Sequence, residues 1–279
     1  MSDAMPGSAH TNDAGTPFFW RVASGVMYAE MPLTRSIRPP LLSPWESERV
    51  QAFRNRDRRS RWLAGRALAK VLVKERLGLP GIVEIREGAD GEPLVYADGF
   101  PLPNVWLGIS VRHGKVSCVL ADRPVSLEVR RAEESEAEVV DSFVARGERR
   151  TLRKLLGSDI AARSAAWAIK EAAQRAARLH QDPAAQMRSV HIDASLGVQA
   201  SPDSADMDVL ALRYLDDVAV AVVGRFLLEE RRTVRIVLDE PAEPVAAPRL
   251  QAAIERSKVR ARRIADARSR WQGMRPAEG

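Results

Sequence analysis

The sequence predicts an α+β fold of two pseudo-symmetric halves packed face to face, each a small antiparallel sheet with a long helix packed on it. The main observation is that a helix, short strands and a hairpin occur twice in the same order. A hydrophobic content of 45% and a charged content of 29% are those of an ordinary globular protein. The repeat is one of pattern only. We expect four parts: a disordered tail (1–17), an N-terminal half (18–123), a C-terminal half (124–226), and a strand, linker and basic tail (227–279).

The composition narrows the class of protein. The single cysteine, Cys118, rules out an internal disulfide framework, and no Cys/His cluster has zinc spacing. No apolar run approaches the roughly 20 residues of a membrane span, and the first seventeen residues do not resemble a secretion signal. A cytoplasmic protein is therefore expected. The net charge of +6 leaves nucleic acid, an acidic protein or a phosphorylated ligand as partners.

The N-terminal half begins with a strand-like segment, residues 18–29, and a proline-rich loop. Ser43 or Ser47 could cap one long helix that runs to residue 77 and ends at Gly78. Its expected apolar face consists of Ala64, Leu68, Val71 and Leu72.

Another face of this helix carries arginines. Arg54, Arg58, Arg61 and Gly65 are spaced by four, three and four residues, so they form one stripe that ends where a ligand could approach closely. The alternative is a solvated basic face.

Short strands follow the helix. Residues 82–86 lead into a turn at 90–93, and residues 104–111 and 115–121 form a hairpin in which Cys118 faces the core. In the next strand, residues 124–130, the apolar residues alternate strictly, which places Ser126, Glu128 and Arg130 together on the opposite face.

The C-terminal half repeats the plan with a helix over residues 160–179, a strand over 190–193, and a hairpin of 210–215 and 218–223. Trp167, Glu171 and Arg175 fall on one helix face, with Lys170 beside them. This face alone is also compatible with a surface helix bearing a Glu171–Arg175 ion pair, worth about 0.3–0.5 kcal/mol.

After residue 226 the composition of the chain changes. Residues 234–238 could form a last strand, residues 241–248 are rich in Pro and Ala, and residues 249–275 read as a strongly basic helix. That helix could contact acidic protein, nucleic acid or an anionic membrane surface, or it could be solvated.

In their order and spacing, these landmarks resemble the 4′-phosphopantetheinyl transferases of the surfactin-synthetase-activating type. The resemblance covers about residues 18–226. The matching motifs are Leu42-Ser43-Pro44, residues 58–66 with Arg61 and Gly65, Gly91-Glu92-Pro93, Ile109-Ser110, residues 124–129 with Glu128, residues 167–172 with Lys170 and Glu171, and residues 218–223.

The resemblance implies an activity. Such enzymes hold coenzyme A, their co-substrate, in a cleft between two halves and transfer its phosphopantetheine arm to a serine of an acyl- or peptidyl-carrier protein of fatty-acid, polyketide or peptide synthesis. Adenosine 3′,5′-bisphosphate is released, and Mg²⁺ held by carboxylates stabilises the developing charge. A monomer is expected.

The resemblance also implies site residues. Glu171 and Lys170 match the catalytic helix motif, and Glu128 and Glu171 would hold the Mg²⁺. Arg61 is the leading coenzyme A contact and Ser110 the hydroxyl that approaches a phosphate. Arg58, Arg175 and Arg130 are the further expected coenzyme A contacts.

Three positions depart from the family's pattern. Glu128 is one methylene longer than the usual aspartate, and Val111 stands where a histidine usually follows Ser110, with His113 two residues on. Arg130 replaces a carboxylate with the opposite charge, and a guanidinium near Mg²⁺ would repel it by about 4 kcal/mol at an effective dielectric near 20.

Three functions therefore compete. One is a working transferase in which Arg130 binds the diphosphate directly. Another is a degenerate paralogue that binds coenzyme A or a carrier protein without catalysis. A basic nucleic-acid-binding protein is disfavoured, because aromatics make up only 5% of the chain and no stacking platform is evident.

Overall fold

The structure, a computed structural model, describes residues 17–33, 41–89, 91–131, 137–177, 189–200, 207–215, 217–225 and 235–237. The chain divides into two units, Met1–Glu243 and Pro244–Gly279, and all described residues belong to the first. The division falls inside the predicted Pro/Ala linker. The predicted basic helix over 249–275 and nearly all of the predicted N-terminal tail lie outside the described residues.

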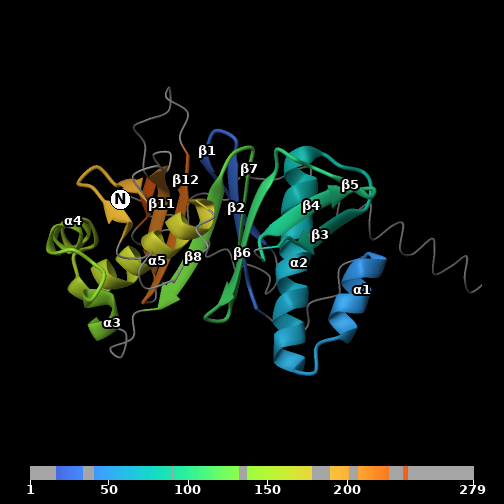
Figure 1. The fold of residues 1–279 in the computed structure, drawn as a ribbon, viewed down its shortest axis with the longest axis horizontal. Coiled ribbons are helices and arrows are strands. Elements are labelled where there is room, and N and C mark those ends of the chain that lie inside the picture. The colour runs from blue at the N-terminus through green and yellow to red at the C-terminus, as the bar shows by residue number, and fades with distance from the viewer. Residues whose placement is uncertain are drawn as a thin grey trace, which may run out of the picture. The chain divides into compact units, whose positions relative to one another are not determined.

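The described residues form a mixed α+β fold built on antiparallel sheets, as the sequence predicts at this level (Figure 1). The first sheet has the strand order β1-β2-β7-β6. Its strands are β1 (Phe18–Ala23), β2 (Val26–Pro32), β6 (Trp106–Arg112) and β7 (Lys115–Ala121). A single strand over residues 18–29 was the wrong prediction, because Gly25 takes a positive φ of 69° and turns the chain into a hairpin.

Two helices replace the single long one predicted after the proline loop. Helix α1 (Pro44–Gln51) is capped by Ser43, and α2 (Arg56–Leu77) is capped by Asn55, whose side chain accepts the Arg58 N–H at 2.9 Å. This second cap explains the break. Helix α2 ends at Gly78, which adopts the left-handed conformation, as predicted. Its apolar face packs on the first sheet and buries Ala64, Leu68 and Leu72.

A smaller sheet, of order β3-β4-β5, follows α2. It consists of β3 (Val83–Glu87), β4 (Pro93–Ala97) and β5 (Phe100–Pro101). The chain then enters the β6–β7 hairpin, whose turn residues His113 and Gly114 both have positive φ, as a two-residue hairpin turn requires.

The third sheet has the order β8-β12-β11-β10-β9, with β13 paired in parallel to β11. Its strands are β8 (Val125–Arg131), β9 (His191–Ile192), β10 (Gly197–Gln199), β11 (Met207–Leu215), β12 (Val218–Gly224) and β13 (Arg235–Val237). Strand β13 lies within the predicted 234–238 strand, and it joins this sheet although it was assigned to the part after residue 226.

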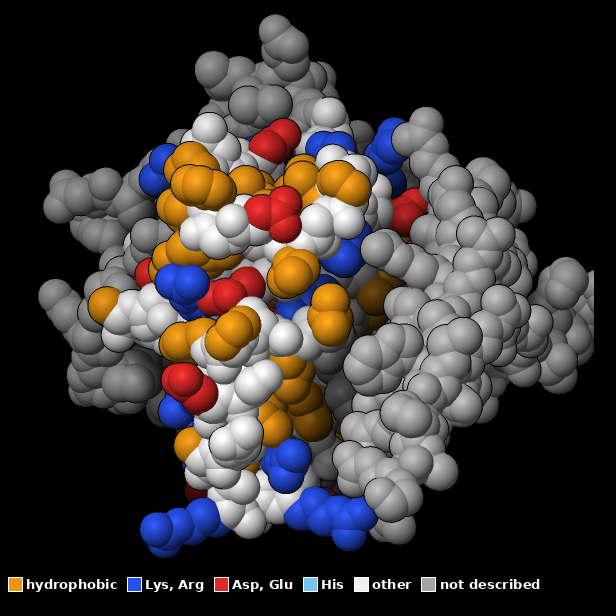
Figure 2. Space-filling model, turned by 90° about the vertical axis from the view of Figure 1, so that its right-hand side faces the viewer, with side chains coloured by type: hydrophobic (Ala, Val, Ile, Leu, Met, Phe, Trp, Pro, Cys, Tyr) orange, Lys and Arg blue, Asp and Glu red, His pale blue; other side chains and the backbone are white. Residues whose placement is uncertain are grey.

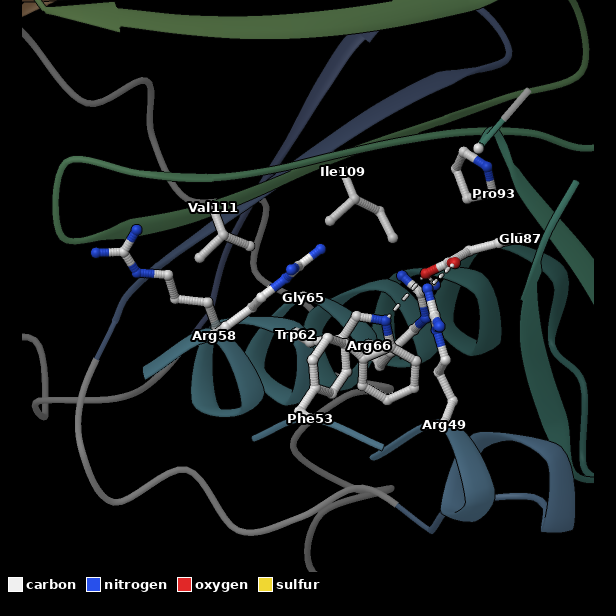
Figure 3. A pocket seen from close by; sticks show the side chains of 12 residues that line it. Arg49, Phe53, Arg58, Trp62, Gly65, Arg66, Glu87, Pro93, Ile109 and Val111 are labelled. Atoms are coloured by element: carbon white, nitrogen blue, oxygen red, sulfur yellow. Dashed lines mark hydrogen bonds and ion pairs between the residues drawn. The ribbon is translucent and has the colours of Figure 1, made fainter. Parts of the chain in front are cut away.

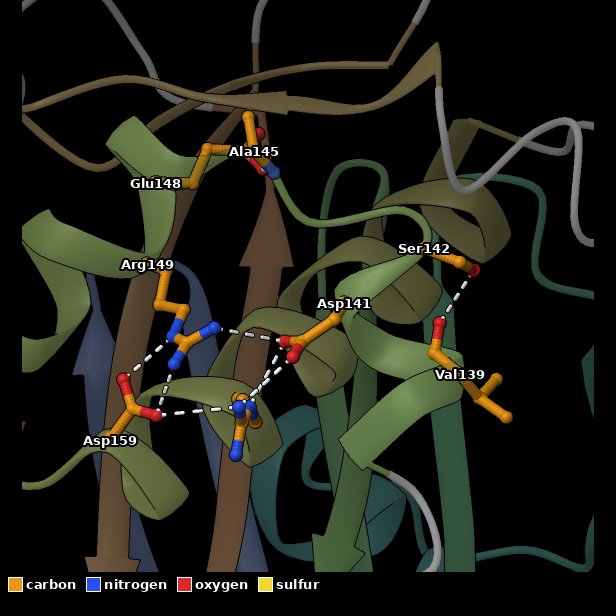
Figure 4. A network of polar contacts seen from close by, with 8 residues as sticks. Val139, Asp141, Ser142, Ala145, Glu148, Arg149 and Asp159 are labelled. Carbon is orange, nitrogen blue, oxygen red and sulfur yellow. Dashed lines mark hydrogen bonds and ion pairs between the residues drawn. The ribbon is translucent and has the colours of Figure 1, made fainter.

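The described residues between β8 and β9 include the helices α3 (Ala137–Asp141), α4 (Arg146–Leu156) and α5 (Asp159–Ala177). Helix α5 covers β8 and β12, and its alanines form a core with the inward residues of that sheet (Figure 1). An exposed ion-pair network ties the three helices together: Arg149 contacts Asp141 and Asp159, and Arg163 contacts the same two carboxylates (Figure 4).

The first and third sheets share a second core. Trp20, Val22 and Tyr28 pack there with Val125, Leu127 and Val129 of β8, whose inward alternation was predicted. Strand β6 lies beside β8. A Cβ placed on Gly108 would lie 3.3 Å from the backbone nitrogen of Leu127, so glycine permits this close approach.

Two buried glutamate–lysine pairs, which we call braces, connect helices to strands. Near α1, Glu46 accepts the N–H groups of Ser43 and Ile85 and pairs with Lys70, which also donates to the Leu41 carbonyl. The buried carboxylate and ammonium thus connect a helix start, the middle of a long helix and a strand.

The same pattern recurs near α4. Glu148 accepts the N–H groups of Ala145 and Ile192, at 2.7 and 2.8 Å, and pairs with Lys170 at 3.1 Å. Lys170 donates to the carbonyl of Phe143, which precedes Ala145 by two residues, as Leu41 precedes Ser43.

Candidate functional site: a basic cleft leading to two glutamates

The first cavity lies against α2 and has a volume of about 380 Å³. Arg58 and Arg61 of the predicted stripe line it, together with Gly65 one turn further along. Both arginines are exposed, and none of the described carboxylates lies within ion-pair distance of either. Arg58 stands beside Val111 at one end of the cavity (Figure 3). Two unpaired guanidinium groups at a cavity favour an anionic ligand.

The other end of this cavity carries a satisfied polar cluster. Glu87 accepts from Arg49 at 2.9 Å, from the Trp62 indole at 3.2 Å and from Arg66 at 3.4 Å (Figure 3). Arg66 also stacks on the Trp62 ring, 4.5 Å from its centroid. Burial lowers the pKa of Arg66, and the charge of Glu87 partly restores it. This cluster fixes the cavity wall and leaves Arg58 and Arg61 as the available cations.

Gly65 has a packing role at this wall. A Cβ there would lie 3.0 Å from Cγ2 of Ile109 and 3.3 Å from Cγ2 of Val111. The glycine therefore admits close contact between α2 and β6, in addition to lining the cavity. Exposed arginines continue along the start of α2 beyond the cavity, and Lys and Arg side chains gather at the corresponding lower edge in Figure 2.

A second cavity, of about 260 Å³, adjoins the first. The two share Gly91, Pro93 and Ile109 in their linings, and we refer to the two adjoining cavities together as the cleft. Most residues that line the second cavity are apolar, with Leu94, Val105 and Trp106 among them, and Glu92, Ser126 and Arg175 are its polar residues. The cleft thus has the arginines of α2 in one cavity and a guanidinium of α5 in the other, whereas Glu128, Glu171 and Arg130 line neither cavity.

Arg175 belongs to a cluster of five charged residues from three elements. Glu128 and Arg130 come from β8, Glu171 and Arg175 from α5, and Arg112 from β6. Arg175 lies 2.6 Å from Glu128 and 2.7 Å from Glu171. Arg130 contacts Glu171 and lies 3.5 Å from Glu128, while Arg112 lies 3.2 Å from Glu128. The structure thus brings together the two glutamates predicted as metal ligands.

Glu128 is the buried member of the cluster, with no exposed surface. Burial raises the pKa of its carboxyl; the charge of Arg175 lowers it, and that of Glu171 raises it. Its contacts with the arginines are short, yet neither oxygen has a partner in hydrogen-bond geometry among the described residues. Glu171 is more accessible, at 16% exposure of its side chain.

Lys170, predicted as catalytic, lies away from this cluster. Its side chain is 1% exposed and belongs to the Glu148 brace, where the ammonium also donates to the Val190 carbonyl. Burial lowers its pKa, and Glu148 partly restores it. Its contacts with Glu148, Phe143 and Val190 give it a structural role.

Ser110 is buried on β6 and lines neither cavity. Because side chains alternate along a strand, Ser110 shares a face with Gly108 and Arg112, toward β8, whereas Ile109 and Val111 face α2. Val111, which replaces the expected histidine, lines the first cavity, and His113 lies in the β6–β7 turn.

Sequence reasoning missed Arg112, Arg49 and Arg66. The signal for Arg112 was available: it follows Gly108 and Ser110 at two-residue spacing, so strand alternation places it on the face toward Glu128. Arg49 and Arg66 could not be found this way, because their meeting point, Glu87, comes from β3.

The donor set, as arranged, does not fit Mg²⁺. This ion prefers carboxylate and water oxygens, and here both carboxylates are paired with guanidinium groups. Among the described residues, no group of three or more His, Cys, Asp or Glu side chains could hold a metal ion.

Comparison with known proteins adds no assignment: neither a family model nor a curated protein matches this chain. In the part of the chain that the structure describes, no helix has the length and apolar character needed to cross a membrane.

Proposed function

We propose that this chain binds coenzyme A in the cleft and transfers its phosphopantetheine arm to a serine of an acyl- or peptidyl-carrier protein. The observation that carries the proposal is that two adjoining cavities are lined by arginines: Arg58 and Arg61 in one, and in the other Arg175, which also contacts Glu128 and Glu171. Coenzyme A has two phosphorylated positions that such arginines can bind, the 3′-phosphate of its nucleoside and the diphosphate that links the nucleoside to a long, largely uncharged arm.

In this proposal, Arg58 and Arg61 bind the phosphates of the nucleotide portion, and the rings of Phe53 and Trp62 stand beside them. The apolar cavity accommodates the pantetheine arm. Arg175, which is 43% exposed and lines that cavity, binds the diphosphate.

The proposed reaction is a displacement at phosphorus. The serine oxygen forms a bond to the phosphorus that bears the arm, the bond from that phosphorus to the bridging oxygen breaks, and adenosine 3′,5′-bisphosphate leaves with the electron pair. Glu171 is placed better than the fully buried Glu128 to accept the serine proton. The guanidinium groups of Arg130 and Arg175 stabilise the charge on the phosphate oxygens.

We further infer that the two halves are related by pseudo-symmetry. Three strands of the first sheet, in the order β2-β7-β6, match the order β8-β12-β11 of the third. The paired braces at Glu46 and Glu148 support the same relation, since each accepts a strand N–H and a helix-start N–H and pairs with a lysine.

A second candidate is binding without catalysis. It is favoured by the ion pairs of Arg130 and Arg175 with Glu171, because they occupy the carboxylate oxygens that would have to accept the serine proton. The ligand and the cleft are the same in both candidates, so the binding experiment below applies to each, and only the transfer experiment separates them.

Coenzyme A binding is tested by calorimetry on wild type and an Arg58→Ala/Arg61→Ala variant. We expect each arginine to contribute several-fold and the double variant to weaken binding by tenfold or more, about 1.4 kcal/mol. Arg59→Ala is the matched control, because Arg59 is exposed on the same helix but does not line the cavity. Equal affinity of all three proteins, or no binding by wild type, contradicts the proposal.

Transfer is tested by intact-mass measurement of an apo carrier protein incubated with this chain and coenzyme A. A gain of one arm, about 340 Da, that is lost in Glu171→Ala is expected for the transferase. Binding without a mass gain across several carrier proteins selects the second candidate.

A further inference from the structure

The two glutamates of the cluster are bridged by guanidinium groups. Arg130 contacts both Glu128 and Glu171, and Arg175 also contacts both. A divalent ion between two carboxylates would make the same kind of bridge. Arg112 adds a third guanidinium on Glu128, so the cluster carries one net positive charge from three arginines and two glutamates.

Arg130 is the fixed member of this set. Its side chain is 14% exposed, and its guanidinium stacks on the Trp167 ring at 4.4 Å from the centroid. Trp167 itself packs edge-on against Phe143, 5.6 Å between centroids. Arg175 and Arg112 are less confined, with side-chain exposures of 43% and 41%. They can turn toward an entering anion while Arg130 stays between the glutamates.

We propose that the guanidinium of Arg130 is the resident cation of this site, in place of a divalent metal ion. The cluster then binds no Mg²⁺, and phosphate groups that enter the cleft meet arginines directly. Only the mention of phosphate rests on the proposed function; the exclusion of the metal ion rests on the charge and contacts of the five residues. Mg²⁺ would have to separate Arg130 from both glutamates and from Trp167.

The test uses Mn²⁺ as the probe, because its electron paramagnetic resonance signal falls when the aqua ion binds protein. Titration of Mn²⁺ with the wild-type chain should leave the signal unchanged at sub-millimolar concentrations. Arg130→Asp reverses the sign of the cluster's net charge and supplies a third carboxylate, so the signal should fall, and excess Mg²⁺ should restore it.

Arg131→Asp is the matched control. It makes the same change of charge one residue along β8, at an exposed position, and should not bind Mn²⁺. Adding Glu171→Ala to Arg130→Asp should abolish the new site. If Arg130→Asp does not fold, the Mn²⁺ titration of wild type tests the inference, together with that of Arg130→Gln, which replaces the guanidinium with a neutral side chain of moderate size.

The inference is overturned if wild type binds one Mn²⁺ that Glu171→Ala removes, or if the folded Arg130→Asp variant binds none. Neither Mn²⁺ measurement requires coenzyme A or a carrier protein. Binding of Mn²⁺ by wild type therefore does not contradict the proposed function, and absence of coenzyme A binding does not contradict this inference. Where transfer is observed, it should persist in EDTA; loss in EDTA with recovery on adding Mg²⁺ would also refute the inference.

Discussion

Lys170→Met should unfold this protein more readily, because Lys170 holds together the brace at Glu148. The Lys170 side chain is 1% exposed, and the Glu148 side chain that it pairs with is 5% exposed. Methionine fills a similar volume but leaves the Glu148 carboxylate buried without a cation, and the hydrogen bonds to Phe143 and Val190 are lost. Breaking one side of a buried ion pair costs about 3–5 kcal/mol.

The assay is urea unfolding followed by the fluorescence of the six tryptophans. With a urea dependence of about 2–3 kcal/mol per molar, the midpoint should fall by about 1–2.5 M. The control is Glu148→Gln/Lys170→Met, which removes both charges and should lie closer to wild type than the single variant. A Lys170→Met protein with a wild-type midpoint and lost transfer activity would refute the structural role and return Lys170 to the chemistry.

Two further substitutions test the site and its support. Burial raises the pKa of Glu128 above its ordinary value of 4.5, so folding favours the protonated carboxyl. The stability gained from this protonated form is fully present below pH 4.5 and is lost as the pH rises through the pKa of the folded state. Glu128→Gln should therefore melt higher than wild type at pH 7, with the gain vanishing near pH 4 in thermal scans; a lower melting temperature at pH 7 would contradict this. Gly108→Ala should cost about 1–3 kcal/mol in chemical denaturation, because the added Cβ would lie 2.9 Å from Cγ1 of Val119 on β7 and 3.3 Å from the backbone nitrogen of Leu127 on β8. Gly147→Ala, with open space around its Cβ, should cost nothing, and equal losses in the two variants would discount the contact.

Much of the fold follows from local signals. Strict alternation in residues 124–130 correctly placed Ser126, Glu128 and Arg130 on one face, and the helical spacing of Trp167, Glu171 and Arg175 correctly placed them together. These signals are strong because each depends on one element with a fixed period.

The predicted elements were wrong where a single turn or capping residue divides them. The direction of a side chain could not be predicted where a residue distant in sequence determines it. Asn55 caps α2 and divides the predicted helix, and Gly25 divides the predicted first strand. The catalytic role of Lys170 stays a prediction, and its position favours a structural role. Its neighbour Glu171 contacts Arg175, but a helix turns by about 100° per residue, so the lysine points instead to Glu148 on α4.

The candidate site could be anticipated only in part. Its glutamates and the arginines of α2 were identified, because the motif order singled them out. Glu128 is paired with Arg112 of β6 and Arg130 of β8. The pair with Arg112 forms because β6 lies beside β8. The sequence of either strand alone does not show it.

The two braces have a consequence for the order of assembly during synthesis. The bond from Glu46 to Ile85 spans 39 residues and that from Glu148 to Ile192 spans 44. The first brace can close as soon as β3 has left the ribosome, long before α5 exists. We therefore expect the nascent chain to complete its arginine cavity once β6 is made, and the glutamate cluster to form later, when β8 and α5 dock.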